Sequence, residues 1–70
     1  MTPFQQFIQE LPHSQYATFR NMVKLEMLKA DLGISDQTFR NWERGATEPD
    51  EAKCAIINQC AEAITGKRIY

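Results

Sequence analysis

Hydrophobic residues recur along this chain at intervals of three and four, the spacing that places them on one face of an α-helix. No run of four or more residues alternates between apolar and polar with the β-branched enrichment of a strand. The pattern therefore predicts an all-α fold, with a single compact domain of about four to five helices over residues 1–70.

The first predicted helix starts at Pro3 and ends before Pro12. Thr2 is a candidate N-cap, and Gln5 completes a capping box in which the two side chains satisfy free backbone N–H groups. Pro12 disfavours helical backbone at Leu11, which closes the segment. The apolar stripe of this helix consists of Phe4, Phe7, Ile8 and Leu11.

The next segment carries two apolar stripes after Ser14, a candidate N-cap. The first stripe consists of Tyr16, Phe19, Val23 and Met27, and the second of Met22, Leu25, Leu28 and Leu32. The segment is either one long helix or two helices with a bend, and the shift between stripes favours two faces buried against different neighbours. Gly33 supplies the left-handed backbone that ends a helix at low cost, so residues 30–36 are predicted to form a tight turn.

Two further helices are predicted after this turn. Ser35 can cap a helix over Asp36–Arg44, which ends at Gly45. Pro49 is expected in the first turn of the last helix, where neighbouring carboxylates complement the positive end of the helix dipole. This helix ends at Thr65-Gly66, and Ile69 folds back over it. Its buried stripe is predicted to consist of Ile56, Ile57, Cys60, Ala61 and Ile64.

The segment from Leu28 to Gly45 combines a helix, a Gly-containing turn and a capped second helix, with apolar residues on both sides of the turn. This is the arrangement of a helix-turn-helix, in which one face of the second helix is free to enter a major groove. A polar strip at steps of three and four lies opposite Phe39 and Trp42. Its arginines suit guanine or the phosphate backbone, and its amides suit adenine. The strip consists of Gln37, Arg40, Asn41 and Arg44.

At these residues the sequence resembles the Xre/lambda-repressor-like family of bacterial and phage helix-turn-helix proteins. The matching residues are LGIS, Thr38, NWERG and Pro49, and the resemblance covers about residues 24–64. It implies a recognition helix that starts at Ser35 and a buried Trp42. Two positions depart from the family's pattern, since Lys29 replaces a small residue and Leu25 replaces a frequent phosphate-binding glutamine. The candidate DNA-binding residues are Ser35, Asp36, Gln37, Thr38, Arg40, Asn41 and Arg44.

We therefore expect a transcriptional regulator that reads the major groove with the helix 35–44 and acts as a homodimer on a two-fold site in double-stranded DNA. The charge balance favours an alternative. Eight basic and nine acidic residues give a net charge of −1, and the segment from Arg20 to Thr47 is only +1, whereas small nucleic-acid binders are usually basic. The alternative is a helical protein-interaction domain that does not bind DNA. A polar strip is also typical of solvated surface, and Asp36 could form an ordinary ion pair with Arg40.

No sequence motif indicates an enzyme. The chain lacks a Cys/His pair at suitable spacing, an isolated carboxylate pair and a Gly-rich phosphate loop. Cys54 and Cys60 are too far apart along one helix for a disulfide and are expected to be reduced, buried groups, with an intermolecular bridge as the alternative. His13 is expected in a loop. We expect no cofactor, no metal and no small-molecule substrate. Apolar runs are too short for a membrane span or a signal peptide, which predicts a cytoplasmic protein.

Overall fold

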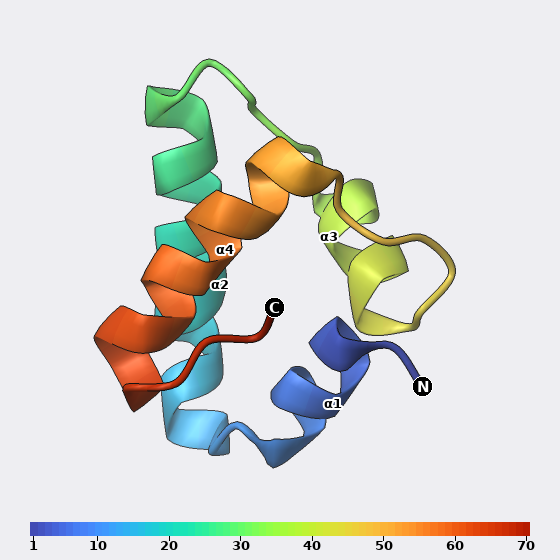
Figure 1. Cartoon of the computed structure of the whole chain (residues 1–70), viewed down its shortest axis with the longest axis vertical. Coiled ribbons are helices and arrows are strands. Elements are labelled where there is room, and N and C mark those ends of the chain that lie inside the picture. The colour runs from blue at the N-terminus through green and yellow to red at the C-terminus, as the bar shows by residue number, and fades with distance from the viewer.

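The computed structural model describes residues 1–70 and has four helices and no strand. In Figure 1, α4 crosses α2 on one side of the molecule, and α1 and α3 lie on the other side. The main helix pairings are α2 with α4 and α1 with α3. The prediction of a compact all-α fold is confirmed. The helices are α1 (Pro3–Glu10), α2 (His13–Lys29), α3 (Asp36–Glu43) and α4 (Glu51–Thr65).

The predicted caps of α1, α3 and α4 are present. The Thr2 hydroxyl accepts a hydrogen bond from the Gln5 N–H at 3.1 Å, and the Gln5 side chain accepts one from the Thr2 N–H at 2.9 Å. Ser35 caps α3 by accepting from the Thr38 N–H at 3.1 Å. Gly66 ends α4 in the left-handed conformation, with φ of 79°. These bonds join residues three or four apart, which is why the sequence predicted them.

The start of α2 differs from the prediction. The helix begins at His13, with Pro12 in the N-cap position and no side-chain cap, so Ser14 lies within the first turn and His13 is not in a loop. The Pro12 carbonyl accepts a hydrogen bond from the Gln15 N–H at 2.9 Å. Pro12 has φ of −57° and ψ of 139°, an extended conformation from which its carbonyl can start the helix.

The end of α2 shows that the segment is one unbroken helix to Lys29. The left-handed residue after it is Asp31, with φ of 60°, and not Gly33. Two bonds form a Schellman motif, since the Leu32 N–H donates to the Met27 carbonyl at 2.8 Å and the Asp31 N–H to the Leu28 carbonyl at 3.1 Å. Aspartate tolerates this conformation better than most residues. The chain therefore reverses two residues earlier than predicted.

The predicted second stripe of α2 is not buried throughout. Met22 and Leu32 are partly buried against the core, but Leu25 is 52% exposed and Leu28 is 68% exposed. The first predicted stripe packs in the core instead, since Phe19, Val23 and Met27 are fully buried. One face of α2 packs on the rest of the chain and the opposite face keeps two leucines in solvent.

Pro49 is also displaced from its predicted position. It precedes the N-cap Asp50, whose carboxylate accepts from the Lys53 N–H at 3.1 Å, and Pro49 itself is buried. Cys54 and Cys60 are both free thiols; Cys60 is buried as expected, whereas Cys54 is only partly buried. Burial raises the pKa of Cys60 to about 11. Of the predicted α4 stripe, Ile57, Cys60 and Ala61 are buried and Ile56 and Ile64 are partly buried.

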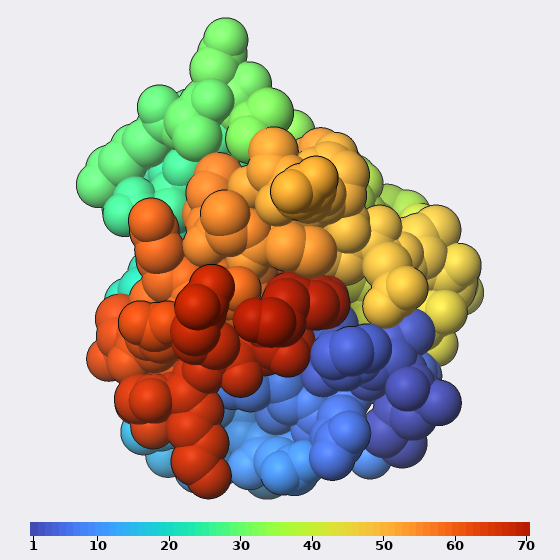
Figure 2. Space-filling view, viewed as in Figure 1, coloured from blue at the N-terminus to red at the C-terminus, as the bar shows by residue number.

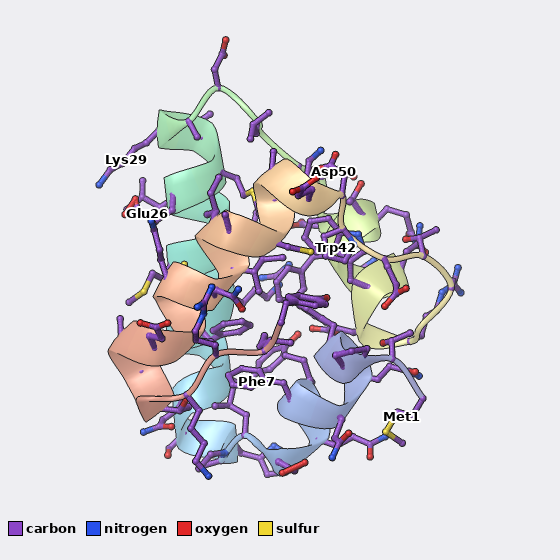
Figure 3. The ribbon with its side chains drawn as sticks, in the orientation of Figure 1. Met1, Phe7, Glu26, Lys29, Trp42 and Asp50 are labelled. Carbon is purple, nitrogen blue, oxygen red and sulfur yellow. The ribbon has the colours of Figure 1, made fainter.

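An aromatic cluster joins α1, α2 and α3 at the centre of the core. The Phe4 ring lies 5.5 Å from Phe39 and 5.8 Å from Trp42, centroid to centroid, in edge-to-face arrangements, and 6.2 Å from Phe19. Trp42 is only 3% exposed and points into the interior in Figure 3, so its predicted burial is confirmed. Such pairs add stability beyond the area that they bury.

The residues after α4 fold back over the core, as predicted for Ile69. Figure 2 shows this C-terminal tail lying between α4 and α1. The buried Asn58 of α4 holds it: its side-chain oxygen accepts from the Ile69 N–H at 3.0 Å and the Tyr70 N–H at 2.9 Å, and its amide donates to the Tyr70 carbonyl at 3.2 Å. Both polar atoms of this buried amide therefore have hydrogen-bond partners within the chain.

Candidate functional site

Helix α3 has three faces with different surroundings. At 100° per residue, Phe39 and Trp42 share one face, which is buried in the aromatic cluster. Asp36 and Glu43, seven residues apart, share an edge that faces α2. The remaining face is turned to solvent, and we call it the outer face of α3. It consists of Gln37, Arg40, Asn41 and Arg44.

Hydrogen bonds along the outer face join three of its four side chains. Gln37 Nε2 donates to Asn41 Oδ1 at 3.1 Å, and Arg44 Nη2 donates to the same oxygen at 2.8 Å. Arg40 and Arg44 have no ion-pair partner within 4.0 Å, and both are exposed. The four strip residues therefore lie on one face of α3, as predicted, and their two guanidinium groups lie in solvent without an ion-pair partner.

The first end of α3 is attached to α2 through Asp36. Its carboxylate accepts hydrogen bonds from Lys24 and, at 3.0 Å, from Arg20. The hydrogen bond and the charge of Lys24 lower the pKa of Asp36, with a smaller contribution from Arg20. Arg20 also stands over the Phe39 ring at 5.8 Å, a cation–π contact. The ion pair considered between Asp36 and Arg40 is not formed, because the two cations of α2 take the carboxylate.

The other end of α3 is attached to α2 through Glu43. The Tyr16 hydroxyl donates a hydrogen bond to the Glu43 carboxylate. Burial of Tyr16, together with this hydrogen bond and the negative charge of Glu43, raises the pKa of Tyr16 to about 12. Asp36 and Glu43 are thus the two points at which α2 fixes the rotation of α3 about its axis.

Three residues of the predicted site lie outside the outer face. Ser35 is the N-cap, and its hydroxyl also lies 3.1 Å from the Thr38 hydroxyl. Asp36 faces α2. All three side chains therefore have partners within the chain, whereas the side chains of the four strip residues form no hydrogen bond or ion pair outside the strip.

Arg20, Lys24 and Tyr16 belong to this site and were missed by the sequence reasoning. They lie 16, 12 and 27 residues from their partners on α3. Helical periodicity relates positions only three or four apart, so no pattern in the sequence indicated these contacts.

The loop after α3 is fixed against the start of α1. Gly45 has φ of 74°, and a Cβ atom added to it would lie 2.4 Å from Gln5 Oε1. The backbone carbonyl of Asn41 accepts from the Ala46 N–H at 2.9 Å, which closes the helix. The left-handed backbone conformation favours glycine at this position, and a larger residue would also displace the end of the Gln5 side chain from its capping position.

Charge is distributed unevenly between this region and the rest of the chain. Arg20, Lys24, Arg40 and Arg44 with Asp36 and Glu43 give α3 and its α2 contacts a charge of +2, so the other residues together carry −3. The acidic excess includes the start of α4, where Glu48, Asp50 and Glu51 cluster. The region around α3 is therefore positively charged although the whole chain has a net charge of −1.

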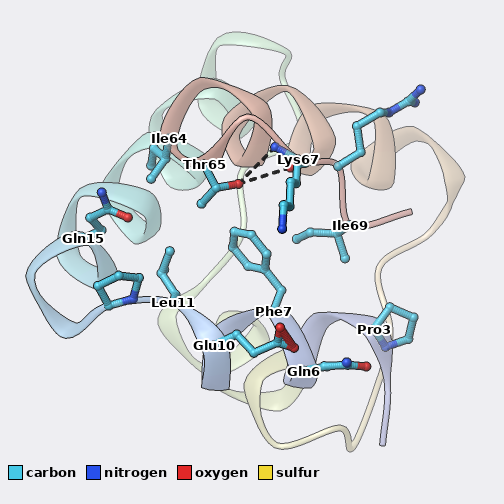
Figure 4. Close-up of a pocket in the computed structure, with 12 residues that line it drawn as sticks. Pro3, Gln6, Phe7, Glu10, Leu11, Gln15, Ile64, Thr65, Lys67 and Ile69 are labelled. Atoms are coloured by element: carbon cyan, nitrogen blue, oxygen red, sulfur yellow. Dashed lines mark hydrogen bonds between the residues drawn. The ribbon is translucent and has the colours of Figure 1, made fainter.

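An open cavity of about 580 Å³ lies between α1, the start of α2 and the C-terminal tail. Figure 4 shows Phe7, Leu11 and Ile69 within it, with Glu10 and Lys67 also in its lining. Its lining has two cations, Lys67 and Arg68, and one carboxylate, Glu10, and Arg68 is paired with Glu62 outside the cavity. The cavity is separate from the outer face of α3, because it includes no residue of α3.

No three His, Cys, Asp or Glu side chains converge where they could hold a metal ion, and no helix has the combined length and hydropathy that crossing a bilayer requires. No protein-family model matches the chain, and no significant match is found among curated proteins or solved structures. The resemblance to the Xre/lambda-repressor-like family therefore stays a prediction.

Proposed function

We propose that the outer face of α3 binds the major groove of double-stranded DNA, and that the chain is a sequence-specific transcriptional regulator. In this proposal α2, the following turn and α3 form a helix-turn-helix. The observation that carries it is the rotation of α3: both of its carboxylates face α2, so the outer face presents only amide and guanidinium groups. These are the groups that read base edges and bind phosphates.

The four side chains have different expected roles. Arg40 lies midway along the length of α3, at the edge of the outer face nearest Asp36, has no ion-pair partner and can donate two hydrogen bonds to a guanine. Asn41 and Gln37 can pair with adenine once the hydrogen bond between them is exchanged for base contacts. Arg44 caps the end of α3 and is suited to a phosphate. Arg20 and Lys24 add positive charge beside the start of the helix.

Selection from randomised duplex DNA at about 50 mM salt tests this proposal, since phosphate contacts are strongest at low salt. We expect an enriched, roughly palindromic sequence, with half-sites about one helical turn apart because a homodimer presents two recognition helices. On that sequence, Arg40→Ala should lose about 1–3 kcal/mol of binding free energy and relax the preference at one base pair.

Arg44→Ala should instead weaken binding to all sequences alike and reduce the salt dependence by about one phosphate contact. Lys67→Ala is the matched control, because it removes the same charge from an exposed position on the C-terminal tail. If Lys67 lies outside the complex, the affinity of the Lys67→Ala variant for DNA should stay within about twofold of the affinity of the parent.

The alternative function is a protein-interaction domain that has this fold and does not bind DNA. It is favoured by the net charge of −1 and by the exposed Leu25 and Leu28 of α2. If no sequence is enriched, and if the variant with Arg40→Ala and Asn41→Ala binds DNA as the parent does, DNA recognition by the outer face is excluded and the alternative takes its place.

A further inference from the structure

The hydrogen bonds along the outer face of α3 have a fixed direction. Arginine has only donor groups, so the Asn41 atom that lies 2.8 Å from Arg44 Nη2 is the amide oxygen, Oδ1. Gln37 Nε2 donates to the same oxygen at 3.1 Å. An amide oxygen has two lone pairs, so both acceptor positions of Asn41 are occupied within α3.

The two amides of the outer face are therefore left with different free groups. Asn41 keeps the two N–H groups of Nδ2, which form no hydrogen bond within the chain, and it has no free acceptor in its side chain. Gln37 keeps its oxygen and one N–H group. Asn41 can thus only donate to a base, whereas Gln37 can both donate and accept.

The four bases present different groups in the major groove. Guanine presents two acceptors, N7 and O6, and adenine presents the acceptor N7 beside the donor N6. Thymine presents the single acceptor O4, and cytosine presents the donor N4. Two N–H groups on one nitrogen therefore match guanine best, and an N–H group beside an oxygen matches adenine best.

The bonds within α3 also favour guanine energetically. If Asn41 paired with adenine through its oxygen, it would have to give up a bond from Gln37 or from Arg44, and the bond from Arg44 belongs to the stronger, charge-assisted kind. A guanine contact through Nδ2 requires neither bond to break. Both bonds hold the Asn41 side chain in one orientation before DNA binds, which lowers the entropy cost of the contact.

We infer that Asn41 selects a guanine through Nδ2 while its oxygen stays bound to Gln37 and Arg44. The inference rests on the proposed function and narrows it, because only Gln37 of the two amides keeps the role of pairing with adenine. Arg44 has further N–H groups, so it can hold Asn41 and contact a phosphate at the same time.

NMR of the free protein tests the hydrogen bonds without DNA. The side-chain amide signals of Gln37 should move in the Asn41→Ala variant, which removes the acceptor of Gln37 Nε2. Arg40→Ala is the matched control, because Arg40 lies one turn from Gln37 on the same face and forms no hydrogen bond with it. Gln37 signals that respond equally to both substitutions would overturn the inference.

Selection from randomised duplex DNA at about 50 mM salt, with the parent and with Asn41→Ala, identifies the base pair that Asn41 reads. One pair in each half-site should lose its preference in the variant, and the parent should prefer guanine there. An enriched site in which that pair prefers another base, or in which no pair loses its preference, would overturn this inference and leave the proposed function standing. Failure to enrich any sequence would overturn both.

A modified base tests the contact at the level of one atom. Replacement of the selected guanine by 7-deazaguanine removes the N7 acceptor and should weaken binding of the parent about fivefold, the effect of about one hydrogen bond. The Asn41→Ala variant has no Nδ2, so it should bind the modified and unmodified duplexes equally. If the modified base weakens binding of both proteins by the same factor, Asn41 does not contact that guanine and the inference is wrong.

Discussion

Helices α3 and α4 bury one face each against the same core, but their exposed faces differ in chemistry. The exposed face of α3 has two guanidinium and two amide groups. The exposed positions of α4 include Ala52, Ala55, Gln59, Glu62 and Ala63, which are small, neutral or acidic. A helix face exposed to solvent can have either the charged and amide residues of α3 or the small and acidic residues of α4. The contrast shows that the polar strip of α3 is not what this chain places on every exposed helix face, and it supports a binding role for α3.

The two helices are also attached by different means. Aromatic rings hold α3 from within, and two side-chain contacts to α2 fix its ends. Aliphatic and small residues hold α4 against α2, and a buried asparagine ties the C-terminal tail to it. If this comparison is correct, substitutions on the inner side of α3 should affect folding and those on its outer face should affect only binding.

The largest effect is expected for Trp42→Ala, on the inner side of α3. Removing a buried aromatic side chain costs about 3–5 kcal/mol, which is much of the roughly 3–10 kcal/mol that typical stability per residue gives a chain of this length. Thermal unfolding followed by circular dichroism measures it. A decrease in Tm of less than about 4 °C corresponds to less than about 1 kcal/mol and would contradict the packing seen in the aromatic cluster.

An intermediate effect is expected for Asn58→Ala on α4. The substitution leaves the Ile69 and Tyr70 N–H groups without their acceptor, and orphaned partly buried groups cost about 1–3 kcal/mol. Hydrogen exchange at the Ile69 amide should accelerate more than exchange within α3. Gln59→Ala, at the adjacent exposed position, is the control and should change stability by less than about 0.5 kcal/mol. Equal effects of the two substitutions would show that the tail is not held by Asn58.

A smaller, pH-dependent effect is expected for Tyr16→Phe, which removes the contact between α2 and Glu43 of α3. Because folding raises the pKa of Tyr16 to about 12, the tyrosine contributes stability that is complete below its ordinary pKa of about 10. That contribution is lost as the pH rises from about 10 through about 12. Urea unfolding should show a constant advantage of the parent over Tyr16→Phe from pH 7 to about 10 and a smaller advantage at pH 11. A constant difference between the two proteins would contradict the hydrogen bond to Glu43.

The smallest effect on folding is expected on the outer face of α3. Alanine at Gln37, Arg40, Asn41 or Arg44 should each change the free energy of unfolding by less than about 0.5 kcal/mol, because no buried group loses a partner and alanine favours helix. Urea unfolding of the four single variants measures this. Any variant that loses more than about 1 kcal/mol has a structural role, and its side chain would then be an unsuitable probe of DNA binding.

Local sequence determined the helix ends and much of the core. The caps at Thr2, Ser35 and Gly66 and the burial of Trp42 depend on residues three or four apart, and a helix brings such residues together wherever it lies in the fold. The same local rules grouped the four residues of the outer face, but they did not indicate the residues of α2 that attach α3.

Tertiary structure decided the features that depend on residues distant in the sequence. Only the packed chain shows that Arg20 and Lys24 pair with Asp36, that Asn58 binds the C-terminal tail, and which of the two apolar stripes of α2 the core buries. An apolar stripe in the sequence shows that one face of a helix is apolar, but it does not show which part of the chain packs against that face. α2 has two such faces, and the rest of the chain can pack against only one of them, so Leu25 and Leu28 were left exposed.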